Sequence, residues 1–180
     1  MMVPDTLQVR EMQEQDIALL VQYWLSADQD FLKGMGVDTS KIPAADVFTE
    51  MLQEQLEQSY EEKKSYCIIW MLNGVPIGHS NVNKIIFGEE AFMHLHIWYA
   101  RGRSVGLGTQ FIKMTLPYFF KNLCLQKICC EPYALNTSPN NTLKKTGFHF
   151  IITYTTTPGW LNFEQPVNRW ELTKAQFEAL

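Results

Sequence analysis

The sequence predicts an α+β fold, with a mixed, mostly antiparallel central sheet flanked by helices. Strand-like and helix-like runs are interleaved without the regular alternation of a βαβ array. An Asn-Gly pair at 73–74 joins two apolar runs, which is the strongest short-range signal for an antiparallel hairpin. We find no internal repeat and no linker, so we expect one domain over residues 1–180.

The first third of the chain predicts one short strand and two amphipathic helices. Residues 7–10 form the strand, and residues 16–26 form a helix with Asp16 placed to cap it. The polar, glycine-bearing residues 28–43 predict a loop. Residues 44–64 predict a second helix, with one apolar face and one solvated face rich in Glu and Gln.

The rest of the chain contains most of the predicted sheet and two further helices. We expect helices over residues 109–122 and 138–147, the second stopped by Gly147. Pro117 removes a backbone donor inside the first of these, which predicts a kink or an early end. The predicted strands are 65–72, 75–87, 91–100, 125–133, 148–157 and 167–174.

Composition excludes several classes of function. The formal charge of −4 argues against a nucleic-acid surface, which is usually basic, and tolerates a cationic substrate. No apolar run reaches the roughly 18 residues that span a bilayer, and no signal peptide is evident, so we expect a cytoplasmic protein. The four cysteines form no C-x-x-C pair, which favours buried free thiols over a metal site. A homodimer is possible.

The stretch RGRSVGLGTQFIK, residues 101–113, lies between a predicted strand and a predicted helix. A Walker loop is excluded because Thr109 and Gln110 follow the last glycine, and a dinucleotide fingerprint is excluded because Phe111 replaces its third glycine. Glycines let backbone N–H groups approach an anion, and the start of a helix favours negative charge. A pyrophosphate therefore fits here; the alternative is a glycine-rich turn without a ligand.

The pattern Arg103-x-x-Gly106-x-Gly108 resembles the R/Q-x-x-G-x-G/A motif of the GCN5-related N-acetyltransferases (GNAT). MLNGVPIGHSNV looks like the central hairpin of aminoglycoside 6′-N-acetyltransferases. EPYALNTSPNNTLKKTGF is similar to their later segment, with Asn136, Lys145 and Phe148 on matching positions. The layout also resembles ribosomal-protein acetyltransferases. The resemblance covers most of the chain and implies the GNAT fold, acetyl-CoA as cofactor, and direct attack of a neutral amine on the thioester.

The resemblance also implies a cofactor site. In relatives, the strand before the glycine loop separates from its neighbour, and its backbone N–H groups hold the pantetheine and the thioester oxygen, as preorganised donors. The loop and the helix start would hold the diphosphate, and Asn136 could bind the cofactor or form an Asx turn before Pro139. The implied cofactor residues are Trp98, Tyr99, Ala100, Arg103, Ser104, Val105, Gly106, Leu107, Gly108, Thr109 and Asn136.

Two histidines are candidates for the catalytic base. Phe92, His94, His96 and Trp98 share one face of a strand because they have equal parity. His94 lies twelve residues before Gly106, where similar enzymes carry a carboxylate or a histidine, and His96 is the second choice. An imidazole with a pKa near ~6.5 accepts a proton at neutral pH. The alternative is two structural histidines; the preceding Glu89 and Glu90 indicate a solvated turn, from which one could act through water.

The sequence departs from the family at the general acid. Many relatives carry a tyrosine seven residues after the motif asparagine, and here that position is Leu143, which cannot donate a proton. Tyr133, Tyr99, Ser138 or water could replace it.

The acceptor region is expected in and around the loop after the first helix. Its acidic and aromatic residues suit a polyamine, an aminoglycoside or a lysine side chain, although each could be an ordinary loop or core residue. Three functions stay open: acetylation of a small amine, acetylation of a protein or peptide, and non-catalytic sensing of acyl-CoA. The candidate acceptor residues are Trp24, Asp28, Asp30, Phe31 and Trp160.

Overall fold

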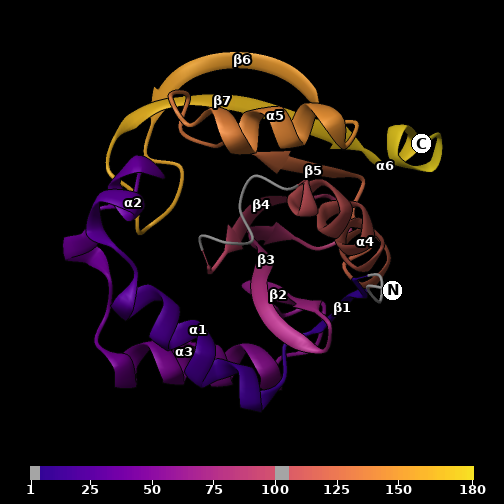
Figure 1. Ribbon diagram of the computed structural model, residues 1–180. Helices are drawn as coiled ribbons and strands as arrows, with labels where there is room; N and C mark the ends of the chain where they lie inside the picture. Colours follow the sequence, from indigo (N-terminus) through magenta and orange to yellow (C-terminus); the bar gives the residue numbers. More distant parts are fainter. Residues whose placement is uncertain (1–4, 100–105) are drawn as a thin grey trace.

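The computed structural model describes residues 5–99 and 106–180 and contains one seven-stranded sheet in the order β1-β2-β3-β4-β5-β7-β6 (Figure 1). All neighbouring strands are antiparallel except β4 and β5, which confirms the mixed, mostly antiparallel sheet. The strands are β1 (Leu7–Glu11), β2 (Ser65–Leu72), β3 (Val75–Ile86), β4 (Glu90–Ile97), β5 (Lys127–Cys130), β6 (His149–Thr156) and β7 (Gln165–Thr173).

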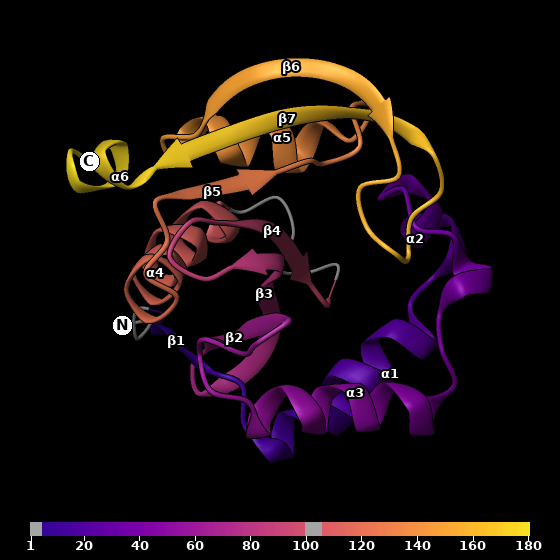
Figure 2. The same cartoon turned by 180° about the vertical axis from the view of Figure 1, so that it is seen from behind.

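The helices lie on both sides of this sheet. In Figures 1 and 2, α1 and α3 lie side by side below the strands β2 and β3, whereas α4 and α5 lie on the opposite side. The described residues form α1 (Ile17–Ser26), α2 (Gln29–Gly34), α3 (Ala45–Glu57), α4 (Leu107–Asn122), α5 (Thr137–Lys145) and α6 (Lys174–Glu178), with short 3₁₀ turns at Glu14–Asp16 and Thr39–Lys41.

Two hydrophobic clusters, one on each face, hold these layers together. Successive side chains of β2 point to opposite faces, and both sets are buried. Ile68 and Trp70 pack into the cluster that contains Phe111 of α4, and the Trp70 ring stacks on that phenylalanine at 5.1 Å between centroids. Ile69 packs into the second cluster, with Trp24 and other residues of α1 and α3. The central strands are therefore buried on both faces.

Two predicted elements are wrong in extent, and one helix was not predicted. The helix predicted over 44–64 ends at Glu57, and the Lys63 side chain then folds back to donate to the Gln55 carbonyl. The loop predicted over 28–43 contains α2 and a 3₁₀ turn, since Asp28 and Asp38 each accept a hydrogen bond from an amide two or three residues ahead. The C-terminal helix α6, with a Thr173–Gln176 capping box, was not expected.

The predicted Asp16 cap is wrong, and so is the early end at Pro117, one of the two outcomes predicted for that residue. Asp16 does not cap α1: its buried carboxylate accepts hydrogen bonds from the Arg10 guanidinium at 2.6 and 2.8 Å and ties β1 to the start of the helix. Pro117 does not end α4, which continues to Asn122. The fully buried Phe119 and the nearly buried Phe120 lie beyond the proline, and their burial offsets the lost backbone hydrogen bond.

The cysteines are free thiols, but Cys124 is exposed, contrary to expectation; Cys67, Cys129 and Cys130 are buried as expected. No helix within residues 5–99 and 106–180 has the length and apolar character to cross a bilayer.

Candidate active site

The sheet opens between β4 and β5. These parallel strands pair only over residues 90–92 of β4, from Glu90–Lys127 to Phe92–Cys129, whereas β4 stays paired with β3 as far as Ile97–Gly78. At the point of divergence, the Cys130 thiol donates to the Met93 carbonyl at 2.9 Å. Beyond this contact lies a gap in the centre of the sheet, which we call the β4–β5 gap. The strand separation that the family resemblance implied is therefore present.

The backbone N–H and C=O groups of successive β4 residues point alternately toward β3 and toward the gap. The Trp98 N–H donates to the Ile77 carbonyl at 2.9 Å, so this amide belongs to the pairing with β3. It is therefore not available to the cofactor, and the prediction that it is a donor is wrong. The amide of Leu95, which has the opposite parity, points toward the gap. The Trp98 ring is buried and donates its indole N–H to His79 Nδ1 at 2.8 Å.

The N-terminus of α4 lies next to this gap. Gly106 has φ +76°, which favours glycine, and the 16-residue helix that follows has no side-chain cap. The first amides of a helix, here including those of Leu107, Gly108 and Thr109, have no intrahelical acceptor and attract anions. The predicted cofactor residues Ala100, Arg103, Ser104 and Val105 lie outside the described residues.

The protein's own packing does not explain why residue 108 is glycine. A Cβ on Gly108 would lie 3.8 Å from Thr142 and 3.9 Å from Ile97, which are ordinary contacts. A Cβ on Gly106 would meet nothing within 4 Å. The missing side chains therefore leave the helix start open to a ligand.

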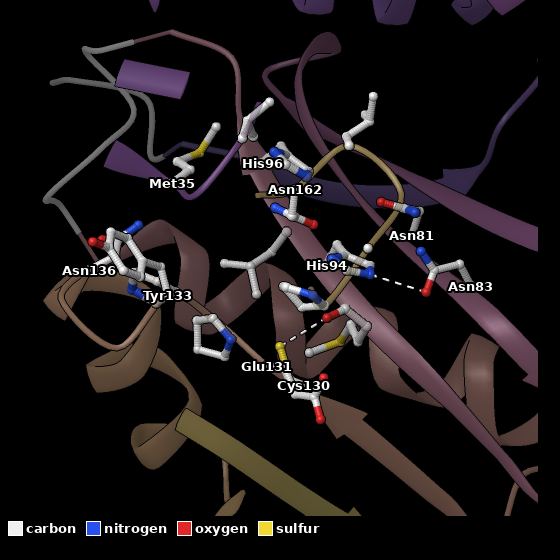
Figure 3. A pocket seen from close by; sticks show the side chains of 18 of the residues that line it. Met35, Asn81, Asn83, His94, His96, Cys130, Glu131, Tyr133, Asn136 and Asn162 are labelled. Atoms are coloured by element: carbon white, nitrogen blue, oxygen red, sulfur yellow. Dashed lines mark hydrogen bonds between the residues drawn. The ribbon is translucent and has the colours of Figure 1, made fainter. Parts of the chain in front are cut away.

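A cavity of about 140 Å³ occupies the gap and extends toward the face that carries α1; we call it the junction cavity. Figure 3 shows His94 and His96 on β4, Asn81 and Asn83 on β3, and Tyr133 and Asn136 around it. Trp24, Met35 and the loop between β6 and β7 complete the lining. The cavity therefore joins the side of the sheet that carries the α4 N-terminus to the side that carries α1.

His94 reaches the cavity with a defined hydrogen-bond partner. Its Nε2 lies 3.2 Å from Asn83 Oδ1 (Figure 3), and because that oxygen accepts, Nε2 carries the proton and Nδ1 holds the lone pair. Burial, and then the positive charge of Lys84, lower the pKa of His94 to about 4. The imidazole is thus neutral at pH 7, and its basicity is far weaker than the ordinary value expected from the sequence.

His96 belongs to an aromatic cluster on the same face. Its Nδ1 lies 3.2 Å from the Tyr23 hydroxyl, its ring meets the edge of Trp24 at 5.0 Å, and it stacks on His79 at 4.8 Å. The predicted shared face of His94 and His96 is therefore present, and both side chains line the junction cavity.

His79 is not among the site residues predicted from the sequence. It is nearly fully buried, and burial, followed by the charge of His94, lowers its pKa to about 3. The register of β3 and β4 pairs His79 with His96. Counting residues across the turn between these two strands brings the two histidines near each other, but one residue out of register because of the irregularity between Asn83 and Ile86.

The residues near the start of α5 contribute to the junction cavity. Asn136 makes no side-chain cap of α5, so the alternative of an Asx turn before Pro139 is wrong, and its side chain lines the cavity.

Leu143 is fully buried in the core and cannot serve as an acid. Tyr133 lines the cavity, whereas Tyr99 is 56% exposed and lies in a separate hollow. Tyr133 is therefore the best placed of the predicted hydroxyl donors.

The two aspartates predicted to bind the acceptor lie elsewhere. Asp28 accepts from the Phe31 amide as the cap of α2, and both residues line the separate hollow beside Tyr99. Asp30 is exposed and lines neither this hollow nor the junction cavity. Of the acceptor residues predicted from the sequence, only Trp24 and Trp160 reach the junction cavity.

The glutamates near β4 are engaged in ion pairs. Glu90 accepts from Lys127 at 2.8 Å at the paired end of the strand, away from the histidines. Glu131 is the only carboxylate among the described residues that line the junction cavity, and it accepts from Arg169 at 3.3 Å and from the Tyr154 hydroxyl. No group of three or more His, Cys, Asp or Glu that could hold a metal ion occurs among the residues described.

A second cavity of about 470 Å³ adjoins the first; we call it the side chamber. It lies between the sheet and the helices α1 and α3. The two cavities share Trp24, Asn81, Asn83, Gly159, Trp160 and Leu161.

Residues 158–162, in the loop between β6 and β7, cover the boundary between the two cavities and are anchored from two sides. Lys84 of β3 donates to the Pro158 carbonyl at 2.7 Å. The Asp38 amide donates to the Leu161 carbonyl at 2.8 Å, and Asn162 Nδ2 donates to the Gly36 carbonyl at 2.8 Å. The loop therefore forms a fixed roof over the cavities.

Comparison with known proteins identifies relatives. A family model described as an acetyltransferase (GNAT) domain matches residues 6–149. The structure of aminoglycoside acetyltransferase AAC(6')-Ib with coenzyme A and kanamycin is 20% identical, with a TM-score of 0.74, and the match covers 97% of this chain and 98% of that one.

Two further solved structures have the same fold. The spermidine N-acetyltransferase from Vibrio cholerae, in complex with CoA and spermine, is 15% identical over 96% of this chain and 98% of that chain, with a TM-score of 0.77. RimL, a ribosomal alpha-N-protein acetyltransferase, is 13% identical over 93% and 94% of the chains, with a TM-score of 0.75. No curated protein matches the sequence.

Proposed function

Since the chain belongs to the GNAT family and is an N-acetyltransferase that uses acetyl-CoA, we propose that it acetylates the primary amine of a small acceptor by direct attack in a ternary complex. The observation that carries this proposal is the β4–β5 gap, which has a glycine-bearing helix start at one side and a roofed cavity with His94 at the other. Cofactor and acceptor can approach the same point from opposite faces.

We assign the cofactor to the α4 side of the gap. The amides of Gly106, Leu107, Gly108 and Thr109 would bind the diphosphate, together with the predicted Arg103, Ser104 and Val105. Tyr99, Ala100 and Asn136 stay predicted cofactor contacts. The Leu95 amide replaces the Trp98 amide as the donor to the thioester oxygen, because it points toward the gap.

Starting from the neutral amine, the chemistry needs one new bond, one broken bond and two proton transfers. An acceptor that arrives as an ammonium first loses one further proton to solvent. The amine nitrogen attacks the thioester carbon, the C–N bond forms, and the C–S bond breaks when the tetrahedral intermediate collapses. Attack makes the nitrogen acidic, so His94 Nδ1 can accept its proton even though this imidazole is a weak base. His96 stays the second candidate. Tyr133 or water would protonate the leaving thiolate.

The acceptor predicted from the sequence is small and cationic, aminoglycoside-like or polyamine-like. Kanamycin and spermine, bound in two of the similar structures, are therefore the first acceptors to test. Acetylation of a protein or peptide is the second candidate, which RimL represents among the similar structures. The roof formed by residues 158–162 favours a small amine as acceptor, because a peptide needs an open groove.

Thiol release from acetyl-CoA, measured with a panel of small amines and peptides, tests the proposal. We expect turnover with at least one small amine and a loss of turnover in His94→Gln that leaves acetyl-CoA binding unchanged. Turnover with peptides alone would contradict it. A cytoplasmic location and a homodimer stay predictions from the sequence.

A further inference from the structure

We propose that the preferred acceptor is an amine with one ammonium group and an apolar body, and that this body occupies the side chamber. The inference rests on the proposed function and specifies its substrate class. It differs from the aminoglycoside-like or polyamine-like examples of the small cationic acceptor predicted from the sequence.

The walls of the side chamber are mostly apolar. Leu20 and Trp24 come from α1, Phe48, Met51 and Leu52 come from α3, and Cys67 of β2 lies on the sheet side. All of these side chains are buried except Met51, which is 43% exposed. A cavity of about 470 Å³ with these walls gains free energy by burying hydrocarbon. Polar side chains also line it: Glu54, Gln55, Gln58, Lys64, Ser65, His79, Asn81, Asn83 and Lys84.

The chamber continues directly into the junction cavity. Asn81 and Asn83 of β3 line both cavities from the sheet, and Trp160 lines both from the roof. An amine held beside His94 can therefore extend its body past Asn81 into the chamber. The asparagine side chains can hydrogen-bond one amine without adding charge.

The charges around the two cavities disfavour additional ammonium groups. Among the described residues that line the side chamber, the ionised groups are Glu54, Lys64 and Lys84, with more positive than negative charge. Glu131, in the junction cavity, is already engaged by Arg169 and the Tyr154 hydroxyl. The second ammonium of a polyamine would thus lie near two lysines, and Glu54 is the one carboxylate in the described lining of the side chamber that could pair with it.

A series of linear alkylamines, from ethylamine to hexylamine, tests the inference, because their basicity is nearly constant while their length grows. We expect kcat/KM to rise by about fourfold per methylene, since each buried CH₂ contributes a roughly constant transfer free energy. Spermidine should react more slowly than hexylamine. A flat series, or spermidine as the best acceptor, would overturn the inference.

One matched pair of variants localises the effect. Met51 and Val47 lie one turn apart on α3 and are 43% and 47% exposed, but only Met51 lines the chamber. Met51→Glu should lower kcat/KM for hexylamine by about tenfold or more and improve the relative rate for a diamine. Val47→Glu should change neither. Equal effects of the two substitutions would overturn the inference.

A binding measurement separates this inference from the proposed function. With methyl-labelled methionine, hexylamine should shift the Met51 signal, which Met51→Leu identifies, whereas spermidine should not. If no amine is acetylated but this shift occurs, the chamber binds apolar amines and the proposed acetylation of small amines fails. If hexylamine is acetylated but the Met51 signal does not move, the proposed function stands and the chamber inference is overturned.

Discussion

The two ends of β4 have different surroundings. At the closed end, Glu90 pairs with Lys127 across to β5, and Phe92 lies beneath the cations of Lys84 and Arg169, at 4.9 and 5.4 Å from the ring centroid. At the open end, β5 has diverged, and His94 and His96 face the junction cavity. The same strand is thus paired on both sides at one end and lines a candidate reaction site at the other.

The difference lies in the missing partner strand. Where β5 is present, backbone groups on both sides of β4 enter the sheet pairing. Where β5 is absent, alternate backbone groups of β4 point toward the gap, and the junction cavity opens there. Substitutions at the open end should therefore affect binding and turnover, whereas substitutions at the closed end should affect stability weakly.

The largest effect should come from the helix start next to the open end. Gly108→Val should weaken acetyl-CoA binding by about 1000-fold, because the side chain would keep the diphosphate from two or three amides that each form a charge-assisted hydrogen bond. Titration calorimetry measures this affinity. A Cβ at this position makes only ordinary contacts, and circular dichroism checks that the valine variant is folded. Normal affinity in a folded variant would exclude this placement of the cofactor; Gly108→Ala is the milder control.

The next effect should come from His94. His94→Gln should lower kcat by about 100-fold, the lower end of general-base contributions, since this imidazole is a weak base. The pKa of His94 is lowered to about 4, so its base form persists from pH 5 to 7. Over this range kcat of the wild type should fall no more steeply than kcat of His94→Gln, in which only the ionisation of the amine remains. A tenfold steeper fall in the wild type would contradict this result.

Asn83→Asp provides the matched test of the same histidine. A carboxylate beside Nε2 stabilises the imidazolium and raises the pKa of His94, so the acid limb of kcat should move upward into the measurable range. An unchanged pH profile in this variant would remove the Asn83–His94 contact from the mechanism.

His79 should make stability depend on pH. Its pKa is lowered to about 3 in the folded state and is ordinary when unfolded, so the unfolded chain takes up the proton first as the pH falls. The free energy of unfolding should decrease by about 2 kcal/mol between pH 7 and pH 5 on account of this residue. Urea unfolding of wild type and His79→Gln measures the difference, with the exposed His149→Gln as control. Equal pH dependence in all three proteins would refute the assignment.

The smallest effect should come from the closed end. Glu90→Gln removes a partly exposed ion pair with Lys127 and should cost less than about 1 kcal/mol of stability, with kcat/KM unchanged. Chemical unfolding and the thiol-release assay check both values. A tenfold loss of activity would mean that the two ends of β4 are not functionally distinct.

Much of the fold could be predicted because it depends on local patterns. The hairpin followed from Asn73-Gly74, both of which have positive φ, and the shared face of His94 and His96 followed from strand parity. The strand separation at β4 came only from the family resemblance, because parity says nothing about where a neighbouring strand ends.

The parts that were missed depend on contacts between distant segments. Asp28 was predicted to border the acceptor because of its chemistry; that it caps α2 and lies away from the junction cavity follows from how this segment folds. The roof depends on Lys84 and Asp38 reaching across to residues 158–162, which no sequence period indicates. The low pKa of His94 likewise results from burial, which residue spacing cannot reveal.

A crystal structure with coenzyme A tests the central claim most directly. We predict that the diphosphate lies over the first amides of α4 and that the sulfur lies in the β4–β5 gap, between Leu95 and Cys130 and within reach of the junction cavity. A sulfur outside the gap, or a diphosphate away from the start of α4, would contradict it.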